Sequence, residues 1–125
     1  MNSRRKGKDG ENELARKLRE FGHDAHRGQQ YSGLMGDADV VGVDGLHIEC
    51  KRTEQVRDEV FLQQAERDAR KGNIPTVFYR RNGEEWKVTL RMQMFMLIWN
   101  ELTDLQKEKI REKIKLSVKP NKIGK

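Results

Sequence analysis

The residues best suited to chemistry are Asp39, Glu49 and Lys51, which lie on either side of a short turn. Phosphodiester hydrolysis needs a hard divalent cation held by carboxylate oxygens, and a cationic group that orients water or stabilises charge on the phosphate. Glu49 and Lys51 are two residues apart, so on a strand their side chains share a face while Cys50 points to the other. Acids and lysines on a solvated strand face are also common without any catalytic role.

Whether Asp39 joins the other two depends on the hairpin turn. Two β-rich runs flank Asp44-Gly45, a typical hairpin signal. A two-residue loop would place Asp39 opposite Cys50, on the wrong face. A three-residue loop ending at Gly45 places it opposite Glu49, and glycine suits the left-handed last position of such a loop. This register also collects four apolar residues on the core face: Ala38, Val40, Leu46 and Ile48. We therefore predict the three-residue loop.

Three further polar residues could complete a site. Glu11 falls on the apolar stripe of an expected helix, where a carboxylate needs a partner or a metal; the helix dipole alone also favours an acid there. Gln64, on the helix after the Glu-x-Lys strand, could reach a water or a phosphate, or be an ordinary surface residue. Ser32, in the loop before Asp39, could touch a phosphate or the metal's surroundings, or simply form a turn.

The elements expected around these residues form one α/β domain on a central sheet. The sequence predicts a flexible basic arm over 3–8 and a helix over 8–21, which carries Leu14, Leu18 and Phe21 on its apolar stripe and is ended by Gly22. An edge strand over 23–27, the hairpin 38–51, a helix over 58–71 and strands over 76–81 and 86–90 are expected to follow. A helix over 92–102 and a last helix to about 116, which a Thr103–Gln106 capping box opens, complete the predicted order. We place the core in 1–103 and a helix with a basic tail in 104–125, within the same domain.

Composition narrows the class of protein. The chain has 125 residues, 37% of them charged, and a net charge of +6, which favours a polyanionic partner. A single cysteine excludes a disulfide framework or a multi-thiolate zinc site within the chain. No apolar run approaches the roughly 20 residues of a membrane span, and no signal sequence is recognisable. We expect a cytoplasmic protein with no membrane partner.

In this order, the residues resemble the PD-(D/E)xK nuclease superfamily, and within it the archaeal-type Holliday-junction resolvases, which also occur in phages. The resemblance covers residues 6–80. Ala38 stands where the name-giving proline is expected, the hairpin is shorter, and 23–26 is unusually polar. The matching positions are Lys6-Gly7, Glu11, Leu14, Leu18 and Gly22 of the first helix, Arg27, Ser32-Gly33, Asp39, Glu49-x-Lys51, and Gln64-Ala65 with Arg70-Lys71-Gly72 of the next helix.

The resemblance implies a restriction-endonuclease-like fold, a mixed sheet flanked by helices. It also implies a homodimeric endonuclease of DNA recombination and repair that resolves four-way junctions by paired nicks. Mg²⁺, replaceable by Mn²⁺, would be held by Asp39, Glu49, the Cys50 carbonyl and Glu11. Lys51 would orient the attacking water, with Ser32 and Gln64 as further members of the active site. The alternatives are another nuclease of this fold (restriction, repair or flap/nicking type), a non-catalytic DNA-binding protein, and a basic protein-interaction module.

DNA contacts are expected from basic residues near the mouth of the site. No element resembles a major-groove helix, so we expect recognition of DNA shape over sequence. The expected phosphate contacts are Arg4, Arg5, Lys6, Lys8, Arg27 and Ser32, with Arg80 and Arg81 as weaker candidates.

Other residues are open to two interpretations. Cys50 is better explained as a small core residue than as a nucleophile. His47 shares the Asp39 face and could be a bystander or a minor participant, and the three histidines form no persuasive zinc set. An apolar helix could contribute to a dimer interface, although such a stripe is more often core: Met92, Phe95, Met96, Ile98 and Trp99.

Overall fold

The computed structural model describes residues 3–28 and 38–117, and the side chains of residues 3 and 4 lie outside the description. The chain forms two compact units, Met1–Leu90 and Arg91–Lys125. The sequence placed the boundary after residue 103 instead, and the shared domain stays a prediction. The first unit contains α1 (Ser3–Glu20), β1 (His26–Arg27), β2 (Val40–Val41), β3 (Leu46–Arg52), α2 (Asp58–Asp68), β4 (Ile74–Arg80) and β5 (Lys87–Thr89); the second contains α3 (Met92–Asn100) and α4 (Asp104–Ser117).

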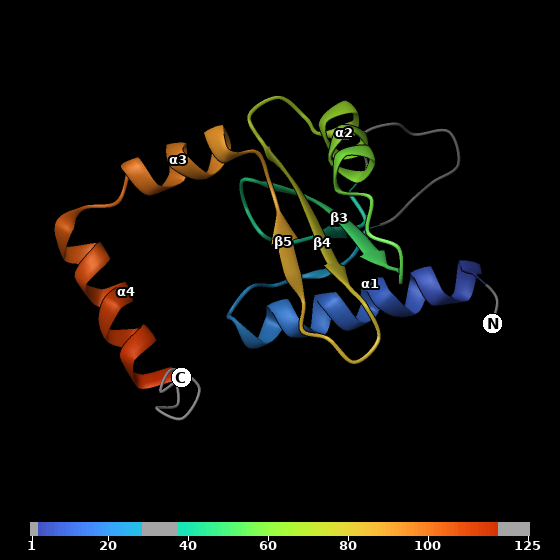
Figure 1. Ribbon diagram of the computed structural model, residues 1–125, viewed down its shortest axis with the longest axis horizontal. Helices are drawn as coiled ribbons and strands as arrows, with labels where there is room; N and C mark the ends of the chain where they lie inside the picture. The colour runs from blue at the N-terminus through green and yellow to red at the C-terminus, as the bar shows by residue number, and fades with distance from the viewer. Residues whose placement is uncertain (1–2, 29–37, 118–125) are drawn as a thin grey trace. The chain divides into compact units, whose positions relative to one another are not determined.

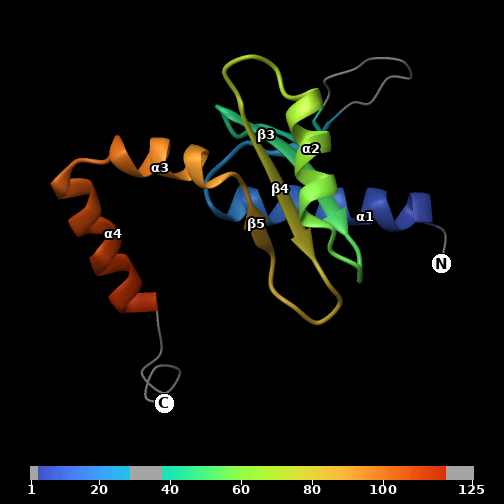
Figure 2. The same ribbon diagram turned by 45° about the horizontal axis from the view of Figure 1, so that its top comes forward.

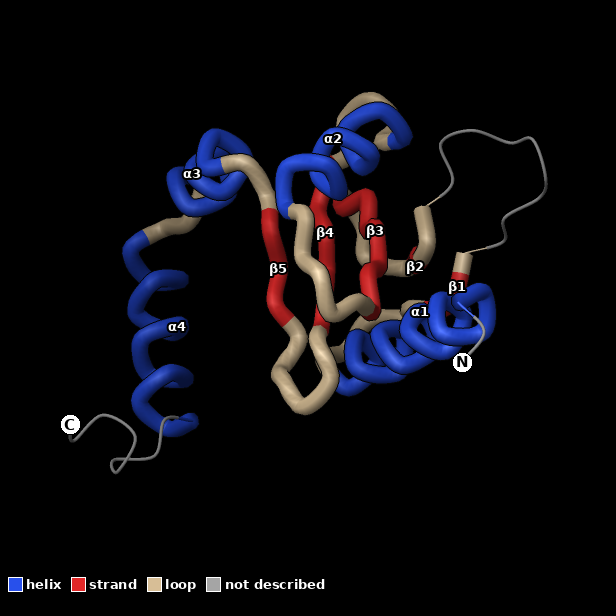
Figure 3. Tube along the Cα trace, turned by 45° about the vertical axis from the view of Figure 1, so that its right-hand side comes forward, coloured by secondary structure: helices blue, strands red, loops and turns tan. Residues whose placement is uncertain are grey.

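The first unit is built on a five-stranded sheet in the order β1-β2-β3-β4-β5 (Figure 1, Figure 3). The pair β3–β4 is parallel and is connected through α2, whereas the other three pairs are antiparallel. A parallel pair needs such a crossover, and a turn suffices for an antiparallel one, as at Gly83 between β4 and β5. The predicted mixed sheet flanked by helices is confirmed.

The helices α1 and α2 cover opposite faces of this sheet (Figure 2). Leu14 and Leu18 of α1 pack with Val40 and Ile48, whereas Leu62 and Ala65 of α2 pack with Val77 of β4. Because side chains alternate along a strand, residues on either side of Ile48 in β3 face α2. The core packing of one face therefore determines which β3 side chains are available on the other: His47, Glu49 and Lys51.

The hairpin between β2 and β3 has the predicted register, with Val40 opposite Ile48. Both side chains are fully buried, and Leu46 packs beside them. Gly45 adopts the expected left-handed conformation, with φ +91°. The strand β2 is shorter than predicted because Gly42 also has a positive φ, +107°, which ends the strand and brings the chain against the backbone of Asp24.

Replacing Gly42 with alanine is expected to lower the free energy of unfolding by about 3 kcal/mol, because a Cβ would meet the Asp24 carbonyl and a positive φ is strained. Gly45→Ala is the matched control. It has a similar φ, but no atom lies within 4 Å of its added Cβ, so only about 1–2 kcal/mol should be lost. Urea unfolding of the metal-free proteins measures both, and equal losses would contradict the close approach.

Two expectations at the N-terminus are wrong. The segment 3–8 was expected to be a flexible arm, but α1 begins at Ser3. Arg and Lys are good helix formers, and acidic residues follow them about one helical turn later, at a spacing that stabilises a helix. Phe21 was placed on the apolar stripe, but it follows the last residue of α1 and is 76% exposed. Gly22 does cap the helix with φ +96°, and its N–H donates to the Arg19 carbonyl at 3.0 Å.

Other element ends also differ from the prediction. The edge strand β1 is limited to His26–Arg27, and α2 stops at Asp68 because Ala69 is already extended. Both segments lie next to glycine- or asparagine-containing turns, where sequence periodicity fades. The second unit has the predicted capping box: the Thr103 N–H donates to Gln106 Oε1 at 2.8 Å, and the Gln106 N–H donates to Thr103 Oγ1 at 3.1 Å.

The helix α3 was interpreted either as core or as an interface. It carries no buried residue, and its Phe95 and Trp99 rings stack with centroids 6.2 Å apart. The described residues therefore do not support the core interpretation. None of the helices in the described ranges combines the length and the hydropathy needed to cross a membrane.

Candidate active site

Asp39 lies at the start of the hairpin and is bound to the backbone of β3. Its Oδ2 accepts a hydrogen bond from the Cys50 N–H at 2.8 Å, between Glu49 and Lys51 in the chain. The Asp39 carbonyl in turn accepts the Gly28 N–H at 2.8 Å, and Gly28 has no room for a Cβ beside the Ala38 carbonyl. The approach of Gly28 and the pairing with β3 thus hold this carboxylate beside the Glu-x-Lys strand.

The electrostatic setting of Asp39 is unfavourable for a free carboxylate. Burial raises the pKa of Asp39 to about 7, helped by the charge of Glu49 and, to a smaller extent, of Glu11, while the Cys50 N–H and Lys51 act in the opposite direction. Burial and the neighbouring carboxylate of Glu49 therefore both make ionisation of Asp39 costly, and Lys51 offsets this cost only in part. A cation at this position would offset both the cost of burying the Asp39 charge and its repulsion from Glu49.

Glu49 lies on the α2-facing side of β3 and is almost completely buried, at 2% exposure. Its Oε2 is 2.8 Å from His47 Nε2, and the imidazole is equally buried. Glu49 thus has a hydrogen-bond partner for one oxygen on its own strand. The predicted alignment of Asp39 with Glu49 is supported by the β2–β3 register and by their electrostatic coupling.

Lys51 is fixed by α2. Its Nζ donates to Gln64 Oε1 at 3.0 Å and lies 5.0 Å from the centroid of the Phe61 ring. These contacts hold the ammonium on the same side as Glu49 and within electrostatic range of Asp39. Gln64 was predicted to reach a water or a phosphate, but in the structure it contacts Lys51. Phe61 was not predicted as a site residue, although its position three residues before Gln64 on the same helix could have indicated it.

Glu11 occupies the buried stripe of α1 as predicted, with its side chain 12% exposed. It is paired with the guanidinium of Arg27, whose Nε donates to Glu11 Oε1 at 2.6 Å. This pair joins α1 to the edge strand β1. Glu11 is also close enough to raise the pKa of Asp39, so its charge reaches the site even though its nearest partner is Arg27.

The donor set fits a hard cation such as Mg²⁺. Within 3–28 and 38–117, no group of three or more His, Cys, Asp or Glu side chains is arranged to hold a metal ion. Mg²⁺, however, usually keeps several waters and takes only one or two carboxylates from the protein, so a pair of acids is sufficient. The burial of Asp39, together with the charge of the nearby Glu49, is the observation that favours a cation here.

The remaining predicted residues are distributed as follows. Ser32 lies outside the described residues, as does the side chain of Arg4. Arg5 and Lys8 are exposed on the first turns of α1, and Lys6 is partly exposed. Arg80 donates to Glu13 Oε1 at 2.8 Å, and Arg81 lies 3.8 Å from Glu84. Arg80 and Arg81 therefore have acidic neighbours within the first unit.

Burial raises the pKa of the Cys50 thiol, and the charge of Asp39 raises it further. A thiol with a raised pKa stays protonated and is a poor nucleophile, in agreement with the interpretation of Cys50 as a packing residue. Its side chain contributes to the α1-facing core. Only its backbone is placed to take part in the site, through the N–H bound to Asp39.

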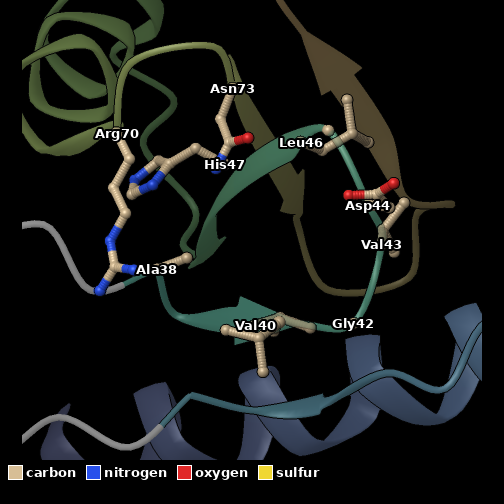
Figure 4. A pocket seen from close by; sticks show the side chains of 11 residues that line it. Ala38, Val40, Gly42, Val43, Asp44, Leu46, His47, Arg70 and Asn73 are labelled. Carbon is tan, nitrogen blue, oxygen red and sulfur yellow. The ribbon is translucent and has the colours of Figure 1, made fainter.

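A cavity of about 470 Å³ adjoins the site. His47, Arg70 and Asn73 contribute its polar wall, and the hairpin loop with Val43 and Asp44 lies on the other side (Figure 4). The cavity does not include Asp39, Glu49 or Lys51. His47 therefore stands between this cavity and the buried carboxylate of Glu49.

The comparisons with known proteins agree with this arrangement. The family model described as "Phage putative PDDEXK endonuclease" matches residues 2–123 of the chain. A comparison with curated proteins gave no match. The family match includes both α1 with Glu11 and the hairpin that carries Asp39, Glu49 and Lys51.

Proposed function

The chain belongs to the phage PDDEXK endonuclease family, and from this premise we propose that it is a Mg²⁺-dependent DNA endonuclease acting on four-way junctions. As a nuclease of the PD-(D/E)xK superfamily it has DNA as its substrate. Asp39 and Glu49 are the proposed metal ligands, with the Cys50 carbonyl and Glu11 completing the set directly or through water. Mn²⁺ is expected to substitute, because it accepts the same oxygen ligands.

The observation that supports this proposal most is the state of Asp39. Burial and the neighbouring carboxylate of Glu49 raise the pKa of Asp39 to about 7, so ionising Asp39 costs free energy that a bound cation would recover. Lys51 alone does not lower the pKa of Asp39 to its usual value near 4. A buried carboxylate that is costly to ionise beside a second acid is the kind of environment in which a divalent cation binds favourably.

The proposed reaction is in-line hydrolysis of one phosphodiester, in which the phosphorus gains a bond to water oxygen and loses its bond to one deoxyribose oxygen. Asp39 and Glu49 would hold the Mg²⁺, which when bound would supply positive charge to neutralise the phosphate and to acidify water. Lys51 Nζ donates hydrogen bonds to the nucleophile or to the phosphate oxygens. Gln64 and Phe61 hold that ammonium in place, so it need not be ordered when DNA binds.

The choice of four-way junctions rests on the resemblance of residues 6–80 to archaeal-type resolvases. Two opposed strands must be nicked at a junction, which calls for two active sites related by a two-fold axis. We therefore propose a homodimer. The apolar, unburied side chains of α3 support an interface of this kind, since Met92, Phe95 and Leu97 are 80%, 47% and 56% exposed.

The exposed N-terminal turns of α1 are proposed to contact DNA phosphates through Arg5, Lys6 and Lys8, together with Arg4 and Ser32. Arg4, Arg5, Lys6 and Lys8 precede Glu11 on α1, and Glu11 is close enough to affect the pKa of Asp39, so DNA held by these residues would lie near the proposed metal ligands. Arg27 would hold Glu11 in place while its exposed part meets DNA. Phosphate contacts alone predict salt-sensitive binding with little sequence preference.

A substrate panel tests the proposal. Purified protein is incubated with a synthetic four-way junction and with linear, nicked and flapped duplexes of the same sequence, with Mg²⁺ or with EDTA. We expect paired nicks in the junction, at least about 10-fold faster than in any other substrate, and none in EDTA. Faster cutting of flaps or duplexes would indicate a different nuclease of the same fold. Salt-sensitive binding without cleavage in any divalent ion would leave only the DNA-binding alternative.

A further inference from the structure

The His47–Glu49 pair is a feature that the proposed reaction does not yet use. The two residues are two positions apart on β3, so both side chains face α2. His47 Nε2 and Glu49 Oε2 are 2.8 Å apart, and each residue is only 2% exposed. Burying two ionisable groups costs free energy, and the hydrogen bond between them offsets part of this cost.

The bond constrains the carboxylate of Glu49. A hydrogen bond to Oε2 limits rotation of the carboxylate and leaves Oε1 without this histidine partner. For an ionised Glu49, the imidazole must carry its hydrogen on Nε2, which makes it the donor. The histidine main chain is anchored as well, because Thr76 Oγ1 donates to the His47 carbonyl at 2.8 Å and is itself buried.

We infer that His47 is a positioning residue that holds one oxygen of Glu49 so that the other is presented to the cation shared with Asp39. The inference rests on the proposed function, since it assumes that Glu49 is a metal ligand. Hydrogen bonds of this type orient metal-binding carboxylates and contribute to metal affinity. His47 lines the neighbouring cavity and also contacts Glu49, which does not line it, so the imidazole separates the carboxylate from that cavity.

The test compares replacements of His47 that have similar length but differ in whether they can donate a hydrogen bond to Glu49. In His47→Gln the amide nitrogen can reach the position of Nε2, whereas His47→Met fills the same space without a hydrogen to donate. Mg²⁺ binding is followed without DNA, as the Mg²⁺-dependent rise in the thermal unfolding temperature, and separately as the Mg²⁺ concentration for half-maximal cleavage. His23→Gln, at an exposed position, is the matched control.

We expect His47→Met to raise the half-maximal Mg²⁺ concentration about 10–100-fold in both measurements, with His47→Gln within a few-fold of the parent and His23→Gln unchanged. In His47→Met, the cleavage rate at saturating Mg²⁺ should come much closer to the parent rate than the cleavage rate at low Mg²⁺ does. If His47→Met does not fold, His47→Asn replaces it, because its shorter amide remains polar but falls short of Glu49.

Two results would overturn the inference. One is a parent-like Mg²⁺ midpoint in the variant that lacks the donor. The other is an equal rise in the Gln and Met variants, which would show that packing alone is required. Failure of the proposed function looks different, because the parent protein itself would then show neither Mg²⁺-dependent stabilisation nor cleavage.

Discussion

Replacing Lys51 with alanine is expected to slow strand cleavage by about 10³-fold or more, while junction binding stays within a few-fold. The ammonium is oriented before DNA arrives, by Gln64 at 3.0 Å and by the face of Phe61. A donor held in this way contributes most when charge develops on the phosphate, so its loss lowers the rate of the chemical step. Because it is one of 26 Lys and Arg residues, its loss changes the overall attraction to DNA little.

Single-turnover cleavage of a labelled junction, with binding measured separately in Ca²⁺, checks this expectation. Lys71→Ala is the control, because Lys71 is an exposed lysine in the turn after α2. Gln64→Leu should give an intermediate loss, since it frees the ammonium without removing it. Cleavage by the Lys51 variant at the parent rate would exclude this residue from the reaction.

Asp39→Asn is expected to abolish cleavage and, at the same time, to stabilise the metal-free protein at pH 8. Burial and the charge of Glu49 raise the pKa of Asp39 to about 7, against about 4 in the unfolded chain. The folded state therefore binds more protons between these values, and stability falls as the pH rises from about 4 to about 7. Asparagine removes this cost and can still accept the Cys50 N–H through its side-chain oxygen.

The size of the effect follows from the shift. A difference of about three pH units corresponds to about 4 kcal/mol, and we expect roughly half of it because the side chain is only partly buried and solvent screens its charge. Thermal or urea unfolding in EDTA should show this gain at pH 8. The gain should shrink below pH 7 and nearly vanish near pH 4.

The exposed Asp44, at the tip of the same hairpin, provides the control substitution Asp44→Asn, which should leave both cleavage and this pH dependence unchanged. Added Mg²⁺ should stabilise the parent protein at pH 8 and have little effect on the Asp39→Asn variant. An Asp39→Asn protein no more stable than the parent at pH 8 would show that the carboxylate is not under strain. In that event the electrostatic support for a cation site is lost.

The sequence was sufficient for the parts of the site that depend on local pattern. Alternation of apolar residues and the conformational freedom of Gly45 selected one hairpin register, and that register brings Asp39 toward Glu49. The capping box at Thr103 and the helix end at Gly22 are also local features, and both are present. The family match confirmed the superfamily that the order of these residues suggested.

Long-range partners could not be predicted in the same way. Glu11 could have turned to a metal or to any nearby cation, and the approach of Arg27, sixteen residues away, depends on how β1 crosses α1. The bond between Lys51 and Gln64 likewise requires the packing of α2 on the sheet. The helical start at Ser3 was missed because a basic, glycine-containing segment carries no apolar periodicity.

The shielded thiol between the two site residues has a practical consequence. The chain has a single cysteine, Cys50, and burial keeps its sulfhydryl protonated at neutral pH. Alkylating reagents therefore react slowly with the native molecule. A cysteine introduced at an exposed position would be labelled selectively without first removing the natural one, so fluorophores for single-molecule observation can be attached while β3 remains unmodified.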